Sequence, residues 1–145
     1  MPDTRLNKRI DLNLNHFEKV LIDLLRQSRT SFRVLARKDL PNGPGVYVIW
    51  QRGWPIYVGE SGNLGGRLYQ HKQGQNSAFW GALEKASVPD TDLFVKGCSF
   101  SYLQLASSKR WTRSWRRQFE HFLLGALGPR FNFVEVEQGQ ARLAS

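Results

Sequence analysis

The sequence predicts an α+β domain, in which helices flank a small three-stranded antiparallel sheet and a helical extension precedes that sheet. The length of 145 residues fits one domain. Two short alternating apolar segments predict a hairpin, and apolar residues at intervals of three and four predict helices around it. We expect a basic helical extension over residues 1–43 packed on the core, a core over residues 44–133, and a tail over residues 134–145.

The first predicted helix covers residues 15–29. Its apolar residues recur with the period of an amphipathic helix, and they are Phe17, Val20, Leu21, Leu24 and Leu25. Asn15 followed by Glu18 is typical of a capping box, which would begin the helix there. A polar, basic stretch then leads to a Pro-Asn-Gly-Pro turn at residues 41–44, which separates the extension from the core.

A hairpin is predicted at the start of the core. Residues 46–51 form its first strand, Arg52 and Gly53 form the turn, and residues 56–58 form its second strand. Each strand carries one tyrosine, Tyr47 and Tyr57.

Two helices are predicted after the hairpin. The first covers residues 64–72, ends before a glycine, and carries Arg67 and His71 on one face. The second covers residues 77–86. An apolar stretch that follows, at 93–105, alternates well enough for one or two strands, which would complete the sheet.

The last predicted helix covers residues 107–127 and ends before Pro129, which cannot continue it. One side is apolar and is expected to pack on the sheet, and it consists of Trp111, Trp115, Phe119, Phe122 and Ala126. The opposite side carries basic residues and one acid, and it consists of Lys109, Arg113, Arg116, Arg117 and Glu120. A salt bridge from Glu120 to Arg116 or Arg117 is the ordinary structural explanation for that acid.

The charge of the chain favours a polyanionic partner. Its 21 Lys and Arg residues outnumber 12 Asp and Glu residues, so the net charge is +9. Residues 106–133 carry six of the basic residues and one acid. We expect this segment to bind nucleic acid, double-stranded DNA above all, through Lys109, Arg110, Arg113, Arg116 and Arg117.

Several classes of protein are disfavoured. The single cysteine, Cys98, excludes an internal disulfide, and three histidines without spaced cysteines do not form a zinc motif. The N-terminus lacks the apolar stretch of a signal peptide, and no apolar run is long enough to cross a bilayer. We therefore expect a cytoplasmic protein without membrane association.

Two triplets carry a resemblance to a known family. Gly45-Val46-Tyr47 is followed after nine residues by Tyr57-Val58-Gly59, and Arg67 lies ten positions beyond Tyr57. Further on, Glu120 is followed by Pro129 and Asn132. In this order the residues resemble the signature of GIY-YIG nucleases over about residues 44–133. The resemblance implies that family's fold and metal-dependent cleavage of DNA.

The chemistry of phosphodiester hydrolysis gives Arg67 and Glu120 distinct roles. Arg67 presents a permanently charged fork that suits two phosphate oxygens, and the preceding Gly65 and Gly66 would let the backbone approach the DNA. Glu120 suits a single Mg²⁺, or Mn²⁺, because a hard dication takes one carboxylate together with water and phosphate. Two ions would need more convergent acids than the core offers.

The remaining site residues are assigned with alternatives. We choose Tyr47 as general base, with its pKa lowered by the cation and by Arg67, as the resemblance also implies. Tyr57 would then orient water or phosphate, although packing of two aromatics across a hairpin is the ordinary explanation. Asn132 would support the site by hydrogen bonding. His71 would lie near the scissile phosphate or simply at the surface. Glu60 departs from the family pattern and would either alter the affinity for the metal or point away from the site, and we expect the second.

The sequence thus leads to a metal-dependent DNA endonuclease that makes single-strand cuts, with Tyr47, Tyr57, Arg67, His71, Glu120 and Asn132 as its catalytic set. The alternatives are a DNA- or RNA-binding module that keeps the fold without catalysis, and an adaptor that meets an acidic protein. Because the chain has no room for a targeting domain, a homodimer or a partner protein would select the target.

Overall fold

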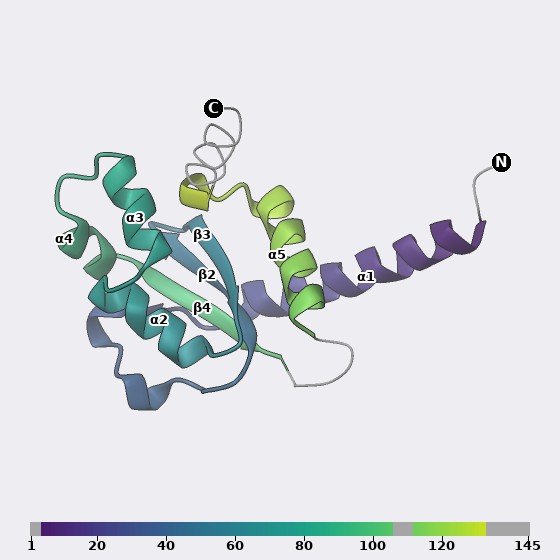
Figure 1. Ribbon diagram of the computed structural model, residues 1–145, viewed down its shortest axis with the longest axis horizontal. Helices are drawn as coiled ribbons and strands as arrows, with labels where there is room; N and C mark the ends of the chain where they lie inside the picture. The colour runs from purple at the N-terminus through teal and green to yellow at the C-terminus, as the bar shows by residue number, and fades with distance from the viewer. Residues whose placement is uncertain (1–3, 106–111, 133–145) are drawn as a thin grey trace.

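The computed structural model describes residues 4–105 and 112–132, with backbone alone over residues 4–14. Within these ranges the sheet has four antiparallel strands in the order β1-β4-β2-β3 (Figure 1). They are β1 (Thr30–Ser31), β2 (Gly45–Gln51), β3 (Trp54–Ser61) and β4 (Ser99–Gln104). The predicted three-stranded sheet lacks β1, which is too short for an alternating pattern to be detected.

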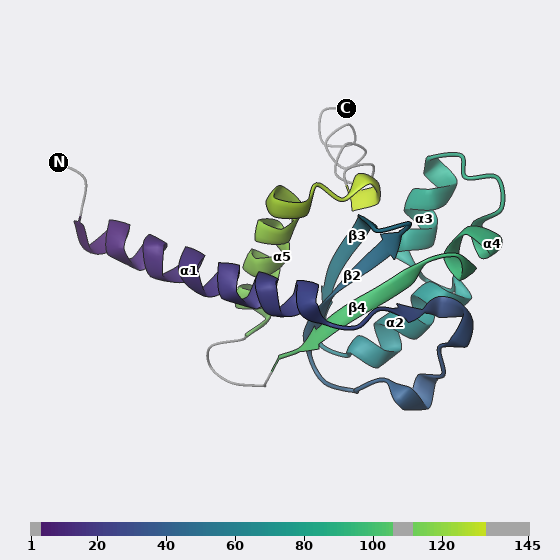
Figure 2. The same ribbon diagram turned by 180° about the vertical axis from the view of Figure 1, so that it is seen from behind.

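Helices cover both faces of the sheet (Figures 1 and 2). One face packs against α1 (Thr4–Arg26) and α5 (Arg113–Leu127). The other packs against α2 (Leu64–Gln73), α3 (Ala78–Lys85) and α4 (Thr91–Lys96), together with the short 3-10 helix η1 (Phe32–Val34). A second 3-10 helix, η2 (Arg37–Asp39), precedes β2. Among the described helices, none has the length and apolar character needed to cross a membrane.

The central strand β2 divides the hydrophobic core into two clusters. Val46, Val48 and Trp50 face the cluster formed with α1 and α5. Tyr47 and Ile49 face the cluster formed with α2, α3 and α4. Because both faces of β2 are covered, its residues from Gly45 to Trp50 are all buried, and the strand is held rigidly between the two layers.

The hairpin and the two helices after it confirm the prediction closely. Arg52 and Gly53 both have positive φ, 50° and 83°, which is the conformation of a two-residue hairpin turn that matches the twist of the strands. The Asn63 side chain accepts a hydrogen bond from the Gly66 N–H at the start of α2, and Ser77 accepts one from the Trp80 N–H at the start of α3.

The N-terminal helix is longer than predicted and begins earlier. It runs from Thr4 to Arg26, so Asn15 lies in its interior, and the predicted capping box is wrong. The turns around Phe17 and Leu24 pack on the sheet, whereas the beginning of α1 extends away from the rest of the molecule (Figures 1 and 2). Arg29 follows the helix and lies 3.8 Å from the centre of the Trp50 ring.

Two boundaries in the second half differ from the prediction. The first part of the predicted strand region 93–105 is the short helix α4, because Asp90 caps it by accepting from the Leu93 N–H. The last helix begins at Arg113, after Thr112 in an extended capping conformation. The predicted start of that helix lies outside the described residues, as do Lys109, Arg110, Trp111 and the tail at 134–145.

Candidate active site

A cavity of about 420 Å³ lies at the outer edge of the sheet, between β3, α2 and α5. Strand β3 is the edge strand, so no further described strand covers it on this side. The cavity is lined by polar side chains of four elements and of the chain after α5, and they are Tyr47, Tyr57, Glu60, Arg67, Arg113, Arg117, Glu120, His121 and Asn132. It therefore combines acids, bases and phenols in one hollow.

Five of the six predicted catalytic residues line this cavity: Tyr47, Tyr57, Arg67, Glu120 and Asn132. The sixth, His71, lies behind the cavity wall and is fully buried, so its predicted alternative as a surface residue is wrong. Of the predicted DNA-binding arginines, Arg113 and Arg117 line the cavity, whereas Arg116 is turned into an ion pair described below. The residues come together from segments up to 85 positions apart, from Tyr47 to Asn132.

The two glycines of the triplets are explained by close packing. Tyr47 pairs with Gly59 across β2 and β3, and a Cβ atom at Gly59 would collide with the Tyr47 hydroxyl. A Cβ atom at Gly45 would collide with Leu64 and with the Leu103 carbonyl. Glycine at position 59 thus leaves the space in which the phenol oxygen of Tyr47 lies.

The glycines before Arg67 have a different role from the predicted one. Gly65 packs against the Arg37 guanidinium and the Pro41 carbonyl, and Gly66 packs against the Asn63 side chain that caps α2. The space that these glycines leave is therefore filled by the chain itself and does not admit DNA.

His71 is held between Tyr47 and Ser77. Its Nε2 atom lies 2.7 Å from the Tyr47 hydroxyl, and its Nδ1 atom lies 2.7 Å from Ser77 Oγ. Burial, and to a smaller extent the charge of Arg67, lower the pKa of His71 to about 3. The imidazole is therefore neutral at pH 7, with one nitrogen as donor and the other as acceptor. Ser77, which the sequence indicates only as a helix start, orients it.

The surroundings of Tyr47 raise its pKa well above the ordinary value of 10. Burial is the main cause, Tyr57 and Glu120 add to it, and Arg67 opposes it through its charge and a hydrogen bond. The sequence analysis expects the pKa of Tyr47 to be lowered. Of the groups that shift this pKa, only Arg67 lowers it. Tyr47 remains a neutral phenol that hydrogen bonds to His71.

Burial raises the pKa of Glu120 to about 7, and the nearby carboxylate of Glu60 adds to the shift. The Glu60 backbone N–H, which donates to Glu120, and the charges of Arg67 and Arg117 oppose it. Near neutral pH this carboxyl group therefore binds a proton readily, and a cation would relieve the same unfavourable charge.

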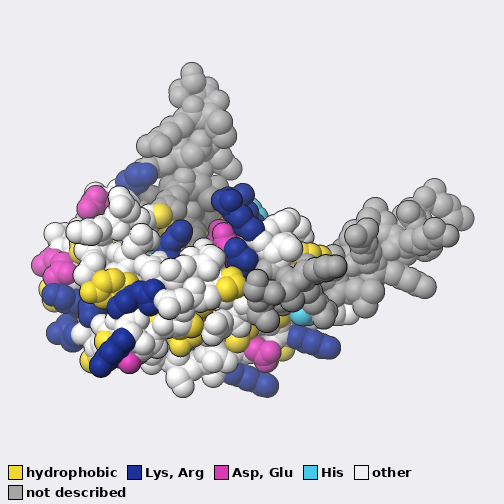
Figure 3. Space-filling view, turned by 60° about the horizontal axis from the view of Figure 1, so that its bottom comes forward, with side chains coloured by type: hydrophobic (Ala, Val, Ile, Leu, Met, Phe, Trp, Pro, Cys, Tyr) yellow, Lys and Arg dark blue, Asp and Glu magenta, His cyan; other side chains and the backbone are white. Residues whose placement is uncertain are grey.

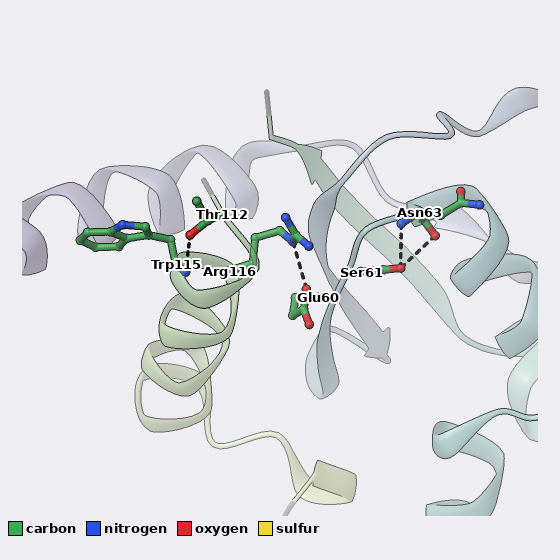
Figure 4. Close-up of polar contacts among 6 residues, drawn as sticks. All are labelled: Glu60, Ser61, Asn63, Thr112, Trp115 and Arg116. Atoms are coloured by element: carbon green, nitrogen blue, oxygen red, sulfur yellow. Dashed lines mark hydrogen bonds and ion pairs between the residues drawn. The ribbon is translucent and has the colours of Figure 1, made fainter. Parts of the chain in front are cut away.

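The prediction that Glu60 points away from the site is wrong. Its side chain forms an ion pair with Arg116 (Figure 4). Arg116 Nε donates to Glu60 Oε2 at 3.0 Å, and the two side chains are only 12% and 15% exposed. The pair joins β3 to the first turns of α5, one turn before Glu120. Of the two partners that the sequence offers Glu120, Arg116 thus pairs with Glu60, whereas Arg117 lines the cavity with Glu120 and its charge lowers the pKa of that acid.

Other polar contacts in Figure 4 fix the ends of the elements beside this ion pair. Ser61 Oγ donates to the Asn63 carbonyl and accepts from the Asn63 N–H, both at 3.0 Å, in the turn from β3 to α2. Thr112 Oγ1 accepts from the Trp115 N–H at the start of α5. The elements that carry Glu60, Arg67 and Glu120 thus begin or end at defined points.

Asn132 binds the backbone of the edge strand. Its Oδ1 accepts from the Val58 N–H at 2.7 Å, and its Nδ2 donates to the Val58 carbonyl at 2.8 Å. These are the groups that a further strand would otherwise satisfy. Asn132 therefore joins the chain after α5 to β3 by hydrogen bonding.

The donor set fits one hard divalent cation. Glu120 supplies a partly buried carboxylate, and the nearby arginines do not fully offset the cost of burying its negative charge. Glu60 lies close to it. The described residues contain no cluster of three or more His, Cys, Asp and Glu side chains suited to a metal ion. One or two carboxylates with water and phosphate are a common set for Mg²⁺, so Glu120 is the residue that would hold it.

No protein-family model and no curated protein sequence matches the chain. Among solved structures, it is similar to the GIY-YIG N-terminal endonuclease domain of UvrC from Thermotoga maritima bound to magnesium, with a TM-score of 0.45 and 21% identity over 63% of this chain and 85% of that one. A point mutant of that domain bound to its divalent cation has a TM-score of 0.45 and 21% identity over 66% and 91%.

Replacing Asn132 tests its contact with the edge strand. Asn132→Ala leaves the buried N–H and carbonyl of Val58 without partners, so we expect the free energy of unfolding to fall by about 2–3 kcal/mol. Urea denaturation followed by circular dichroism measures this. Asn15→Ala, on the exposed side of α1, is the control and should change it by less than about 0.5 kcal/mol. Equal losses in the two variants would contradict the role given to Asn132.

Replacing Glu120 tests the raised pKa. Since the folded protein favours the protonated acid, the wild type should lose stability as the pH rises from about 4.5 to about 7, whereas Glu120→Gln, which stays neutral, should not. In chelator at pH 8 we expect the variant to be more stable by about 1–2 kcal/mol, the full shift being reduced by solvent screening. Thermal melts at several pH values measure this. A difference that does not change with pH would contradict the shift.

Proposed function

We propose that this protein is a divalent-metal-dependent DNA endonuclease that hydrolyses phosphodiester bonds at the cavity beside β3. The observation that supports this most is the convergence of Tyr47, Arg67 and Glu120, from three separate elements, on one hollow. A phenol joined to a neutral imidazole, a permanently charged arginine and a carboxylate suited to a cation are the groups that this reaction requires.

Basic side chains around the cavity support DNA as the substrate. Arg67, Arg113 and Arg117 are exposed and line the cavity. On the face shown in Figure 3, Lys and Arg side chains gather around an acidic side chain. Arg67 suits two oxygens of the scissile phosphate, and the arginines of α5 suit neighbouring phosphates of the same duplex. These contacts position the backbone and carry no sequence information, so target choice would rest on a second copy or a partner protein.

Tyr47 and His71 form a path for the proton of the attacking water. When the His71 proton is on Nδ1, facing Ser77 Oγ, Nε2 accepts the hydrogen bond of the Tyr47 hydroxyl. As the water oxygen attacks phosphorus, its proton passes to the Tyr47 oxygen and the phenol proton passes to His71. Tyr47 then serves as base without becoming a free phenolate, which its raised pKa disfavours.

The charge of the substrate helps this transfer. An imidazolium is disfavoured in the buried site, as the lowered pKa of His71 shows. A bound phosphate places negative charge near Tyr47 and Arg67, and negative charge nearby favours the protonated imidazole. The dyad would therefore accept a proton when substrate is present.

Glu120 lines the same cavity as Tyr47 and is near enough to raise the pKa of that phenol. A Mg²⁺ or Mn²⁺ ion bound by Glu120 would polarise the phosphate and stabilise the leaving oxygen. The water oxygen bonds to phosphorus, the bond to the leaving oxygen breaks, and that oxygen takes up a proton from solvent. One such centre cuts one strand in each encounter, and a double-strand break would need a second event.

We place this activity in the cytoplasm.

A second function, a DNA- or RNA-binding module without catalysis, is favoured by the Glu60–Arg116 pair. Because Glu60 is paired with Arg116, Glu120 is the carboxylate left for a cation, and with its raised pKa a proton competes with the cation for it when the pH is below about 7. In this alternative the basic cavity binds the phosphate backbone, and no bond is broken.

Cleavage of supercoiled plasmid tests the proposed function. The wild type should nick it with Mg²⁺ and stop in chelator. Glu120→Gln and Tyr47→Phe should each lower the nicking rate by at least about a hundredfold, because one loses the cation site and the other the proton path. The matched control is Glu84→Gln, an exposed acid on α3, which should cut like the wild type.

Two outcomes of that experiment would decide against the proposal. Undiminished cutting in chelator, or by Glu120→Gln, would reject the metal-dependent mechanism. Salt-sensitive DNA binding without cutting by the wild type, with either metal, would favour the binding module instead.

A further inference from the structure

A second cavity, of about 300 Å³, lies where the β2–β3 turn meets the chain after α5. Figure 1 shows these two segments side by side at one end of the sheet. The cavity is lined chiefly by Arg52, Trp54, Ile56, Arg130 and Phe131. Its volume is at the lower end of the range for small-ligand sites, which is sufficient for one flat ring system of moderate size.

Trp54 is the most exposed of the large hydrophobic side chains that the structure describes, at 74%. Single exposed apolar side chains are common at protein surfaces, but this one stands beside a cavity. The turn before it has a fixed conformation, because Arg52 and Gly53 both adopt positive φ. Trp54 therefore presents a broad aromatic ring from a rigid support, without a folding role that accounts for it.

The charge around this second cavity is positive. Arg52 and Arg130 line it and are exposed, and the Arg130 guanidinium lies 5.1 Å from the centre of the Phe131 ring. Among the described lining residues, none is acidic. An exposed aromatic ring and two guanidinium groups that line the same cavity match a nucleotide, whose base stacks on the ring and whose phosphate pairs with arginine.

The second cavity adjoins the first along the edge strand. Ile56 lines the second and Val58 lines the first, and two residues on a strand span about 7 Å. Phe131 and Asn132, which are consecutive, likewise line one cavity each. Since successive bases in one strand of DNA rise by about 3.4 Å, a strand bound at the first cavity reaches the second within a few nucleotides.

We infer that the second cavity binds an unpaired base of a single-stranded segment next to the phosphate held at the first. A base inside a duplex has both faces covered by its neighbours, so only an unpaired or extruded base can stack on Trp54. The substrate class is therefore DNA with a junction between duplex and single strand, such as an overhang or a flap. The order of the two cavities on one DNA rests on the proposed function, whereas the binding of an unpaired base does not.

Fluorescence anisotropy in chelator tests this with two DNA probes, a blunt duplex and the same duplex with a single-stranded overhang. The wild type should bind the overhang probe more tightly. Trp54→Ala should weaken overhang binding about tenfold without changing blunt-duplex binding, and Trp54→Phe should retain most of it. Leu93→Ala, another exposed apolar side chain at 61%, is the matched control and should leave both affinities unchanged.

The arginines give a second, independent variant. Arg52→Ala combined with Arg130→Ala should reduce the salt dependence of overhang binding by about 1.4 in log–log slope, as expected for two lost phosphate contacts on a single strand. Circular dichroism should show that each variant keeps the wild-type fold, as expected for exposed positions.

Equal affinity of the wild type for both probes would overturn the inference, as would a Trp54→Ala variant that binds the overhang probe like the wild type. Measured separately, plasmid cleavage distinguishes this result from the proposed function. A protein that binds overhangs through Trp54 but cuts nothing keeps the inference and loses the nuclease. If the protein cuts plasmid and the Trp54→Ala variant binds the overhang probe like the wild type, the nuclease is kept and the inference is lost.

Discussion

The pairing of Tyr47 with Gly59 across β2 and β3 is the constraint on which the candidate site depends. Because Gly59 has no side chain, the Tyr47 hydroxyl packs directly against it. The phenol oxygen therefore lies beside the cavity and within hydrogen-bond distance of His71. Asn132 joins the same edge strand to the chain after α5, the helix that carries Glu120. Tyrosine and glutamate, which are remote in sequence, are thus placed relative to each other through one strand.

Much of the fold could be predicted because its signals are local. The Arg52-Gly53 turn and the caps of α2 and α3 each involve a few consecutive residues with one favoured conformation. Strand β1 and helix α4 could not be predicted, since two residues show no alternation and six residues span less than two helical turns. Their conformations depend on the partners that the folded chain brings to them.

The candidate site divides in the same way. Spacing predicted that Tyr47, Arg67 and Glu120 would act together, and the structure places them around one cavity. It could not predict that His71 is buried behind Tyr47, or that Glu60 turns to Arg116. Both depend on packing between distant elements, and on the cost of leaving a charge or a polar group buried without a partner.

In the proposed mechanism Glu120 and Tyr47 face one shared cation position, and crystals soaked in Mn²⁺ test this most directly through anomalous scattering. We expect one strong peak per molecule, within about 2.2 Å of a Glu120 carboxylate oxygen, the distance typical of small divalent ions, and inside the cavity that Tyr47 and Arg67 line. No peak beside Glu120, or a peak only at another surface, would contradict the account.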